Sequence, residues 1–262
     1  MIPIALTIAG SDPSGGAGIQ ADLKTFHRFQ VYGEAAISLI TVQNTRGVTR
    51  VEVLSPELVR QQIEAVLQDI PPNAVKTGAL GNRAVVEAVA EALTESVRGR
   101  GLPLVVDPVM MSSQGESLLD PDAKQAMIER LLPITFVFTP NLDEATALVG
   151  FPIKDLGLAK RAAKVLLEMG PRNILIKGGH FPGDAIDLLL LENGDFRLLT
   201  AEKIDSRHTH GTGCTYSAAI TAGLASGASL LDSATAAKLF ITKAISSAPG
   251  LGEGHGPLNH FA

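Results

Sequence analysis

Short apolar runs rich in β-branched residues alternate with longer amphipathic stretches along almost the whole chain. Parallel strands need a crossover of a dozen or more residues, usually a helix, so this alternation is typical of a mostly parallel sheet covered by helices. The runs that fit strands are 4–9, 36–42, 74–76, 104–106, 136–138, 174–177, 186–191 and 196–199. The stretches that fit helices are 19–29, 56–68, 84–97, 121–131, 142–149, 158–169, 214–225 and 230–248.

The last two predicted strands are separated by Glu192-Asn193-Gly194-Asp195. An Asn-Gly pair between two apolar runs is typical of a hairpin turn, so we expect antiparallel strands at one edge of the sheet. No linker, block of like charges or long internal repeat divides the chain. We therefore expect a single domain over residues 1–262.

Composition excludes several classes of function. The net charge is −5 and no run of Lys and Arg stands out, which argues against nucleic-acid binding. Aromatic residues make up only 4% and tryptophan is absent, which argues against stacking platforms for single strands. No apolar stretch approaches the ~20 residues that span a bilayer. A single cysteine and an N-terminus without a basic segment predict a cytoplasmic protein.

Two common nucleotide motifs are missing. No Gly-Lys pair occurs, which excludes the Walker phosphate loop. The glycine-rich segment 10–18 follows the first predicted strand but lacks the GxGxxG spacing, so dinucleotide binding remains only an alternative. His208 and His210 have no third ligand at metal spacing and are interpreted as loop residues.

The junction at 208–215 is the strongest candidate for a phosphate site. Gly211, Thr212, Gly213 and Cys214 open a predicted helix, where backbone N–H groups and the helix dipole favour an anion. The same position predicts a lowered pKa for the Cys214 thiol. The alternative is that Gly-Thr-Gly caps a core helix and Cys214 is a small buried hydrophobe.

Polar residues at other predicted strand ends also have two interpretations. Asn141 and Glu144 have the spacing of a helix cap, but Glu144 could also approach a Mg²⁺-bound phosphate. Asp107 ends an apolar strand, which favours a site residue over a core residue. Lys177 precedes two glycines and is either a phosphate ligand or a solvated lysine.

These segments occur in an order that resembles the hydroxymethylpyrimidine/phosphomethylpyrimidine kinase family of thiamine biosynthesis, within the ribokinase-like superfamily. The segments that carry the resemblance are 9–22, 42–45, 106–110, 139–145, 177–180 and 209–215.

The resemblance implies a three-layer α/β/α sandwich that uses ATP and Mg²⁺ to phosphorylate 4-amino-5-hydroxymethyl-2-methylpyrimidine and then its monophosphate. It implies that Cys214, at a position held by Asp in sugar-kinase relatives, takes the hydroxyl proton. The amides of residues 211–214 would stabilise the transferring phosphoryl group. Lys177, Asn141 and Asp107 would face the nucleotide, with Mg²⁺ near Glu144 and Asp107. Family precedent points to a homodimer.

For the pyrimidine, the matching positions are Gly10, Asp22, Gln43 and Val109. Gln43 offers a donor and an acceptor to an aminopyrimidine edge, although on spacing alone it is an ordinary strand-end amide. Asp22 on spacing alone is an acid on a helix surface, and the resemblance moves it toward the site. His210 and residues 250–256 are further candidates for the nucleotide side.

Ala79 departs from the family pattern, because many relatives have Met there. A smaller side chain could admit a bulkier ring, and some pyridoxine kinases share the Gly-Thr-Gly-Cys junction. Pyridoxine or pyridoxal is therefore the alternative substrate. A non-catalytic ligand-binding relative is a third possibility, against which Cys214, Lys177, Asp107 and Glu144 argue together.

Overall fold

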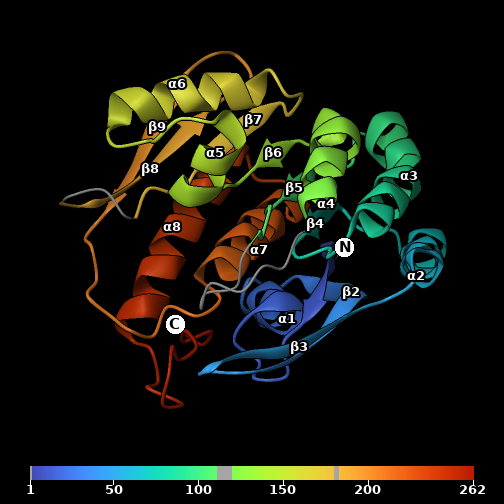
Figure 1. Cartoon of the computed structure of the whole chain (residues 1–262), viewed down its shortest axis with the longest axis horizontal. Helices are drawn as coiled ribbons and strands as arrows, with labels where there is room; N and C mark the ends of the chain where they lie inside the picture. Colours follow the sequence, from blue (N-terminus) through green and yellow to red (C-terminus); the bar gives the residue numbers. More distant parts are fainter. Residues whose placement is uncertain (1, 111–119, 180–182) are drawn as a thin grey trace.

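The computed structural model describes residues 2–110, 120–179 and 183–262 (Figure 1). The strands are β1 (Ile4–Ser11), β2 (Tyr32–Asn44), β3 (Gly47–Val53), β4 (Ala74–Thr77), β5 (Leu104–Val106), β6 (Val137–Phe138), β7 (Asn173–Ile176), β8 (Ala185–Leu190) and β9 (Phe196–Ala201). They form one nine-stranded sheet in the order β3-β2-β1-β4-β5-β6-β7-β8-β9. From β2 to β7 every neighbouring pair is parallel.

Antiparallel strands lie at both edges of the sheet, whereas the sequence predicted them at one edge only. At the predicted edge, β8 and β9 form the hairpin around the Asn-Gly turn. At the other edge, β3 pairs antiparallel with β2. The search for apolar runs missed β3 because its valines alternate with Thr49, Arg50 and Glu52 on a largely solvated edge. Alternation, not apolar continuity, is the signal of such a strand.

The helices are α1 (Gly18–Arg28), α2 (Pro56–Asp69), α3 (Arg83–Arg100), α4 (Pro121–Ala126), α5 (Leu142–Val149), α6 (Leu156–Leu167), α7 (Thr212–Ala225) and α8 (Leu230–Ser246). Their bounds agree with the predicted ranges to within a few residues except at 121–131. There α4 ends at Ala126 and the chain continues as a π-helical turn over Met127–Leu131. Side-chain caps begin several helices; the Ser55 hydroxyl, for example, accepts from Leu58 N.

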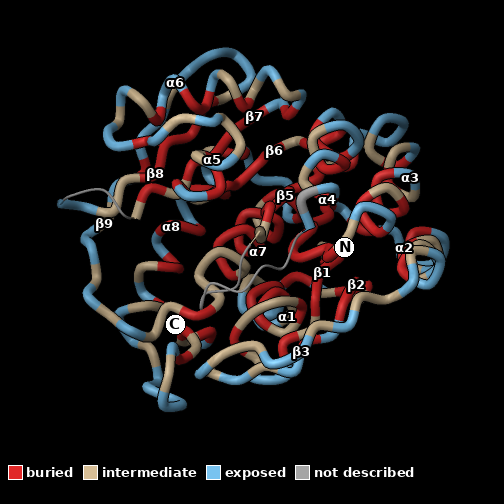
Figure 2. The backbone as a smooth tube through the Cα atoms, viewed as in Figure 1, coloured by how far each residue is buried: buried red, intermediate tan, exposed pale blue. Residues whose placement is uncertain are grey.

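Alternate side chains of the strands face two different cores. Leu6, Val75 and Val106 pack with α2 to α6 in one core, while Ala5 and Val105 pack with α1, α7 and α8 in the other. The central strands and α7 are mostly buried (Figure 2). The predicted three-layer α/β/α sandwich is therefore confirmed.

Helix α7 is buried over most of its circumference and carries no charged residue, as expected for a helix enclosed between the sheet and other helices. It packs against α1 and α8 and its N-terminus points to the carboxyl ends of the central strands. Within the described residues, no helix combines the length and the apolar character that crossing a bilayer requires.

Candidate active site

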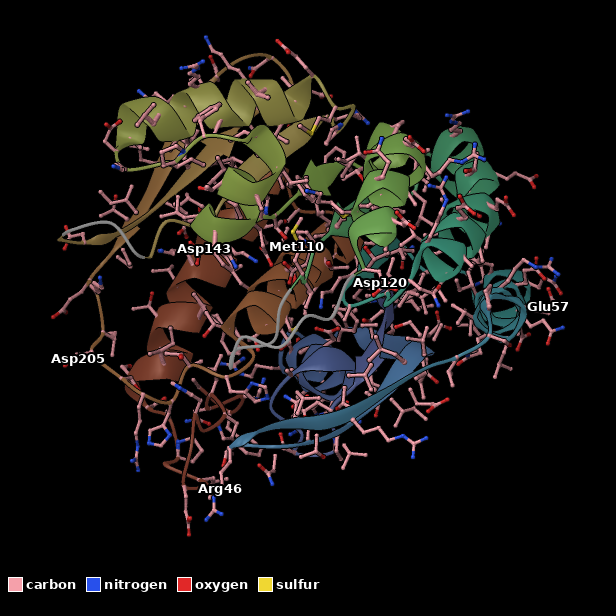
Figure 3. All side chains as sticks on the ribbon, viewed as in Figure 1. Arg46, Glu57, Met110, Asp120, Asp143 and Asp205 are labelled. Atoms are coloured by element: carbon pink, nitrogen blue, oxygen red, sulfur yellow. The ribbon has the colours of Figure 1, made fainter. Side chains whose placement is uncertain are left out.

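A cavity of about 1070 Å³ lies at the carboxyl ends of the parallel strands. Its lining includes Met110 after β5, Asp143 at the start of α5 and Asp205 between β9 and α7, which Figure 3 labels. Every site residue predicted from the sequence lines this cavity except Asp22. Ligands of open α/β sheets bind at this edge, so the cavity is the candidate active site.

The turn before α7 forms the floor of the cavity. Gly211 adopts a left-handed conformation with φ of 80°, and a β-carbon there would overlap the carbonyl oxygen of Gly16. Thr212 Oγ1 donates to Thr209 O at 2.7 Å, which holds the turn closed. Thr212 N donates to Thr209 O at 3.2 Å, whereas the N–H groups of Gly213 and Cys214 have no carbonyl partner within the helix, and both residues line the cavity. An anion fits here.

Lys177 follows β7 and reaches the same place. A β-carbon on Gly213 would lie 3.2 Å from Lys177 Nζ and 3.5 Å from Asp107 Oδ2. Lys177 Nζ donates to Asp107 Oδ1 at 2.8 Å, and the lysine side chain is only 13% exposed. Burial alone would lower the pKa of Lys177, but the carboxylates of Asp107 and Glu144 raise it. Lys177 is thus a buried cation beside the turn, and the solvated alternative is wrong.

Asn141 and Glu144 form the helix cap that their spacing predicts. Asn141 Oδ1 accepts from Glu144 N and Glu144 Oε2 accepts from Asn141 N, both at 2.8 Å. Both residues also line the cavity, so the cap and the site coexist. Burial raises the pKa of Glu144, with Asp107 adding to the rise and Lys177 opposing it. The cap therefore fixes a carboxylate close to Lys177 and Asp107.

Cys214 lines the cavity at the first turn of α7, but its predicted ionisation is wrong. Burial raises the pKa of the thiol to about 11, and Asp22 and Asp107 contribute to the rise. Lys76 and the Gly18 backbone N–H lower the pKa of the thiol, but their effect is smaller than the rise caused by burial. Loss of hydration outweighs the helix N-terminus, so Cys214 is a thiol at neutral pH in the free protein.

Asp22 lies behind the cavity wall, neither solvated nor lining the cavity. Its Oδ1 accepts from Lys76 Nζ and its Oδ2 accepts from Thr7 Oγ1, each at 2.6 Å. The side chains of Asp22 and Lys76 are both 0% exposed. Sequence reasoning missed Lys76, although a lysine inside a buried strand is the signal of a paired internal charge.

Comparison with known proteins agrees with this geometry. Residues 12–259 match the sequence profile of the family described as phosphomethylpyrimidine kinase. The chain belongs to this kinase family. A hydroxymethylpyrimidine/phosphomethylpyrimidine kinase of Bacillus subtilis (strain 168) is 46% identical over 98% of this chain and 94% of its own length. One of Rhizobium meliloti (strain 1021) is 47% identical over 100% of this chain and 98% of its own.

Solved structures of related kinases share the fold. A phosphomethylpyrimidine kinase of Clostridium difficile 630 superposes with a TM-score of 0.80 at 43% identity, covering 93% of this chain and 99% of its own. The pyridoxal kinase of Staphylococcus aureus in complex with pyridoxal superposes with a TM-score of 0.90 at 36% identity, covering 100% of this chain and 94% of its own. The same pyridoxal kinase is also solved with ADP and with AMP-PCP.

Three of the four residues predicted to face the ring line one part of the cavity in this family member, here called the far wall, and Asp22 does not. Gly10, Gln43 and Val109 line it together with Ala79. A β-carbon on Gly10 would press on the Leu39 side chain, and Val109 has an unusual positive φ of 24°. Such strain in a non-glycine residue is often found at ligand sites.

Sequence reasoning missed two further polar clusters of the kinase site. Asp12 Oδ2 lies 2.7 Å from His210 Nε2, which joins the first loop to the turn before α7. Asp187 accepts from Gly178 N at 2.9 Å and from Tyr216 Oη and Lys238 Nζ at 2.8 Å. An aspartate in an otherwise apolar strand was the available signal for Asp187.

One of the two further candidates for the nucleotide side falls elsewhere. Residues 250–256 are absent from the described cavity lining and lie against the turn between β2 and β3, where His255 N donates to Thr45 O at 2.9 Å. His210 does line the cavity. His180, the last residue of the 177–180 segment, lies outside the described residues.

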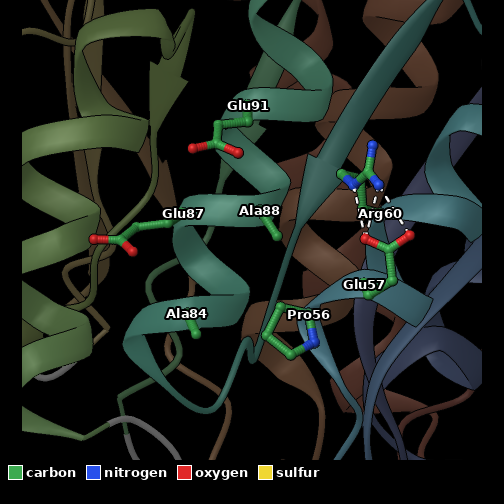
Figure 4. A pocket seen from close by; sticks show the side chains of 7 residues that line it. All are labelled: Pro56, Glu57, Arg60, Ala84, Glu87, Ala88 and Glu91. Carbon is green, nitrogen blue, oxygen red and sulfur yellow. Dashed lines mark hydrogen bonds and ion pairs between the residues drawn. The ribbon is translucent and has the colours of Figure 1, made fainter.

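A second, shallow groove of about 250 Å³ runs between α2 and α3 (Figure 4). Its polar side chains are mostly exposed, and Arg60 is already paired with Glu57 at 2.7 Å. Exposed pairs of this kind contribute little and leave no inward-facing reactive group. The groove does not resemble a catalytic site.

Proposed function

We propose that the chain transfers the terminal phosphoryl group of ATP to the hydroxymethyl group of 4-amino-5-hydroxymethyl-2-methylpyrimidine, and then to the resulting monophosphate. The observation that carries the proposal is the position of Gly213, whose β-carbon would lie 3.2 Å from Lys177 Nζ and 3.5 Å from Asp107 Oδ2. Helix amides, an ammonium group and a carboxylate thus converge at one point of a large cavity. The full-length relatives named for this activity support the substrate.

In the proposed reaction, the substrate hydroxyl oxygen bonds to the terminal phosphorus while the bond from that phosphorus to the ADP oxygen breaks. ADP leaves with the electron pair, and the hydroxyl proton passes to the thiolate form of Cys214, whose own proton has first gone to water. Phosphoryl transfer depends mainly on positioning and electrostatic stabilisation. The amides of residues 211–214 and the Lys177 ammonium group provide both for the transferring group.

Mg²⁺ is the metal that we propose for the site. Asp107 and Glu144 offer carboxylate oxygens in the same cavity, and Mg²⁺ is usually held by one or two carboxylates together with substrate phosphates. When bound, Mg²⁺ neutralises charge on the phosphate oxygens. The cap formed with Asn141 orients Glu144 for this role, and Lys177 orients Asp107.

Pyridoxal is the second candidate acceptor. Ala79 lines the cavity with a small side chain, and the chain superposes on the S. aureus pyridoxal kinase with a TM-score of 0.90. Pyridoxal and the aminopyrimidine are both methylated heteroaromatic rings with a hydroxymethyl group. The far wall of the cavity therefore decides between them.

The first experiment measures ADP release with Mg²⁺-ATP and four acceptors in parallel: the hydroxymethylpyrimidine, its monophosphate, pyridoxine and pyridoxal. We expect turnover with the first two. Turnover with the pyridoxine compounds alone would replace the proposed substrate, and no turnover with any acceptor would favour a ligand-binding protein.

Cys214→Ala tests the proton acceptor, and we expect kcat to fall by ~10²-fold or more. A second measurement is the pH profile. Because burial raises the pKa of the thiol to about 11, the thiolate fraction rises about tenfold per pH unit below that value. We expect kcat/KM to rise between pH 7.5 and 9.5 in the wild type and to be flat in Cys214→Asp. A flat wild-type profile would remove Cys214 as the base.

We further propose that residues 1–262 act as one domain, that the protein is cytoplasmic and that it forms a homodimer. The continuous sheet from β3 to β9 supports the single domain. Sedimentation velocity of the purified protein measures the oligomeric state, and a monomer at micromolar concentration would contradict the dimer.

A further inference from the structure

Four polar side chains form a continuous series of contacts along the wall of the cavity near Gln43. Thr41 Oγ1 lies 3.0 Å from the carbonyl oxygen of Ser11 and 3.1 Å from the Gln43 amide atom assigned as Oε1. The amide atom assigned as Nε2 lies 3.3 Å from His210 Nε2. His210 Nε2 lies 2.7 Å from Asp12 Oδ2. The oxygen and nitrogen of an amide are nearly isosteric, so hydrogen-bond chemistry decides which end is which.

The Asp12 end of the series accepts hydrogen bonds only. Its carboxylate already accepts from Ser14 N at 2.8 Å, from Ser14 Oγ at 2.9 Å and from Ala17 N at 2.9 Å. Burial alone would raise the pKa of Asp12, but the bonds from His210 and Ser14 lower it. Because an ionised carboxylate has no hydrogen to give, His210 Nε2 carries the hydrogen between them. That nitrogen cannot also accept one from Gln43.

The contacts of Thr41 require the same orientation of the Gln43 amide. The carbonyl oxygen of Ser11 can only accept, so the single hydroxyl hydrogen of Thr41 is used there. Thr41 Oγ1 can then only accept from Gln43. The two ends of the series agree: the amide nitrogen belongs beside Thr41 and the amide oxygen beside His210. In the reverse orientation, two acceptors would face each other at the Thr41 end and two donors would face each other at the His210 end.

We propose that Thr41 and the Asp12–His210 pair fix the Gln43 amide in this orientation, and that the fixed amide selects the ring edge of the acceptor substrate. The inference rests on the proposed function. An aminopyrimidine edge has an amino donor next to a ring-nitrogen acceptor. The fixed amide accepts from the amino group on the His210 side and donates to the ring nitrogen on the Thr41 side.

The fixed orientation discriminates against rings without that edge. Pyridoxal has no amino group, and the oxygen of its ring hydroxyl cannot donate once it is ionised. That oxygen would place an acceptor opposite the Gln43 oxygen, and sites built for a hydrogen bond reject ligands that lack it. Thr41 and His210 are thus specificity-determining residues that act through Gln43.

A neutron structure of the perdeuterated, unliganded protein tests the orientation without any assay of activity. We expect two deuterons on the amide atom of Gln43 nearest Thr41 and one deuteron on His210 Nε2. Deuterons on the amide atom that faces His210 would overturn the proposal.

Thr41→Val and Thr41→Ser test the consequence for specificity. Thr41→Val removes the acceptor for the amide nitrogen, whereas Thr41→Ser keeps the hydroxyl. We expect the ratio of kcat/KM for the hydroxymethylpyrimidine over pyridoxal to fall ~10- to 100-fold in Thr41→Val and to be retained in Thr41→Ser. An unchanged ratio in a folded Thr41→Val protein would contradict the selection of the ring edge. A wild type that phosphorylates neither acceptor would contradict the proposed function and leave the neutron result to decide the orientation.

Discussion

Two largely buried pairs of lysine and aspartate lie near Cys214, and they differ in what they face. Asp22 and Lys76 are both 0% exposed and bind each other at 2.6 Å behind the cavity wall. Asp107 and Lys177 bind each other at 2.8 Å, but both line the cavity and Lys177 is partly exposed. The two pairs share their chemistry and differ only in access to a ligand.

The difference separates a structural charge from a functional one. Asp22 receives a further hydrogen bond from Thr7, so both of its carboxylate oxygens are paired within the protein. The Lys177 ammonium group can exchange part of its bonding with Asp107 for a phosphate, at little cost in rearrangement. The closed pair contributes an electrostatic field at Cys214, and under the proposed function the open pair would contribute a phosphate ligand.

The largest expected effect comes from breaking the closed pair. Lys76→Met leaves Asp22 as an unpaired buried carboxylate, which costs about 3–5 kcal/mol of unfolding free energy. Urea denaturation followed by circular dichroism measures the loss. In the control, Lys76→Met combined with Asp22→Leu removes both charges, and we expect it to recover most of the stability. A single variant as stable as wild type would show that the pair is not closed in solution.

Breaking the open pair affects activity more than stability. We expect Lys177→Met to lower kcat/KM for ATP by ~10²-fold, because a buried ammonium group no longer stabilises the transferred phosphoryl group. The denaturation midpoint should fall less than in Lys76→Met, because Asp107, although its side chain is only 2% exposed, lines the cavity and lies 3.2 Å from Ser217 Oγ. Lys164→Met, an exposed change on α6, is the matched control. A large loss of stability with normal kinetics would reverse the assignment of the two pairs.

Glu34 differs from both pairs because it is a buried carboxyl group without a partner among the described residues. Neither of its oxygens has a hydrogen bond within that part of the chain. Burial, with a smaller contribution from Asp69, raises its pKa to about 7. The folded state therefore binds this proton more tightly than the unfolded state, and stability is lost as pH rises from about 4.5 through 7.

We expect Glu34→Gln to raise the free energy of unfolding by roughly 1–2 kcal/mol at pH 8 and to change it little at pH 4.5. Denaturation midpoints at the two pH values measure this, with the exposed Glu95→Gln on α3 as control. A gain that is equal at both pH values would assign the effect to packing instead of ionisation.

Local sequence patterns predicted most of the fold. Apolar runs located the central strands, and the Asn-Gly pair located the β8–β9 hairpin. The pattern failed where tertiary contacts decide the outcome. Strand β3 is held by pairing with β2 instead of by burial of an apolar run, and the turn at Met127–Leu131 is π-helical without any sequence signal that we recognised.

The sequence predicted which residues line the site but not the pKa values of its ionisable groups. Residues at strand ends and at the start of α7 could be named because parallel strands bring their carboxyl ends to one edge. The pKa of Cys214 could not be predicted from the sequence. It depends on how much water the folded cavity removes and on Lys76, Asp22 and Asp107, which come from three other segments. Pairing between distant charges, such as Asp187 with Lys238, is equally invisible along the chain.

The contact between Asp12 and His210 joins residues 198 positions apart. During synthesis the ribosome releases the N-terminal loop early, but the glycine turn that completes the phosphate site emerges only after about four-fifths of the chain has been made. Nascent and C-terminally truncated chains therefore have β1 and its loop without the anion site. Under the proposed function, a chain that ends before Gly211 would lack the anion site and would have no kinase activity.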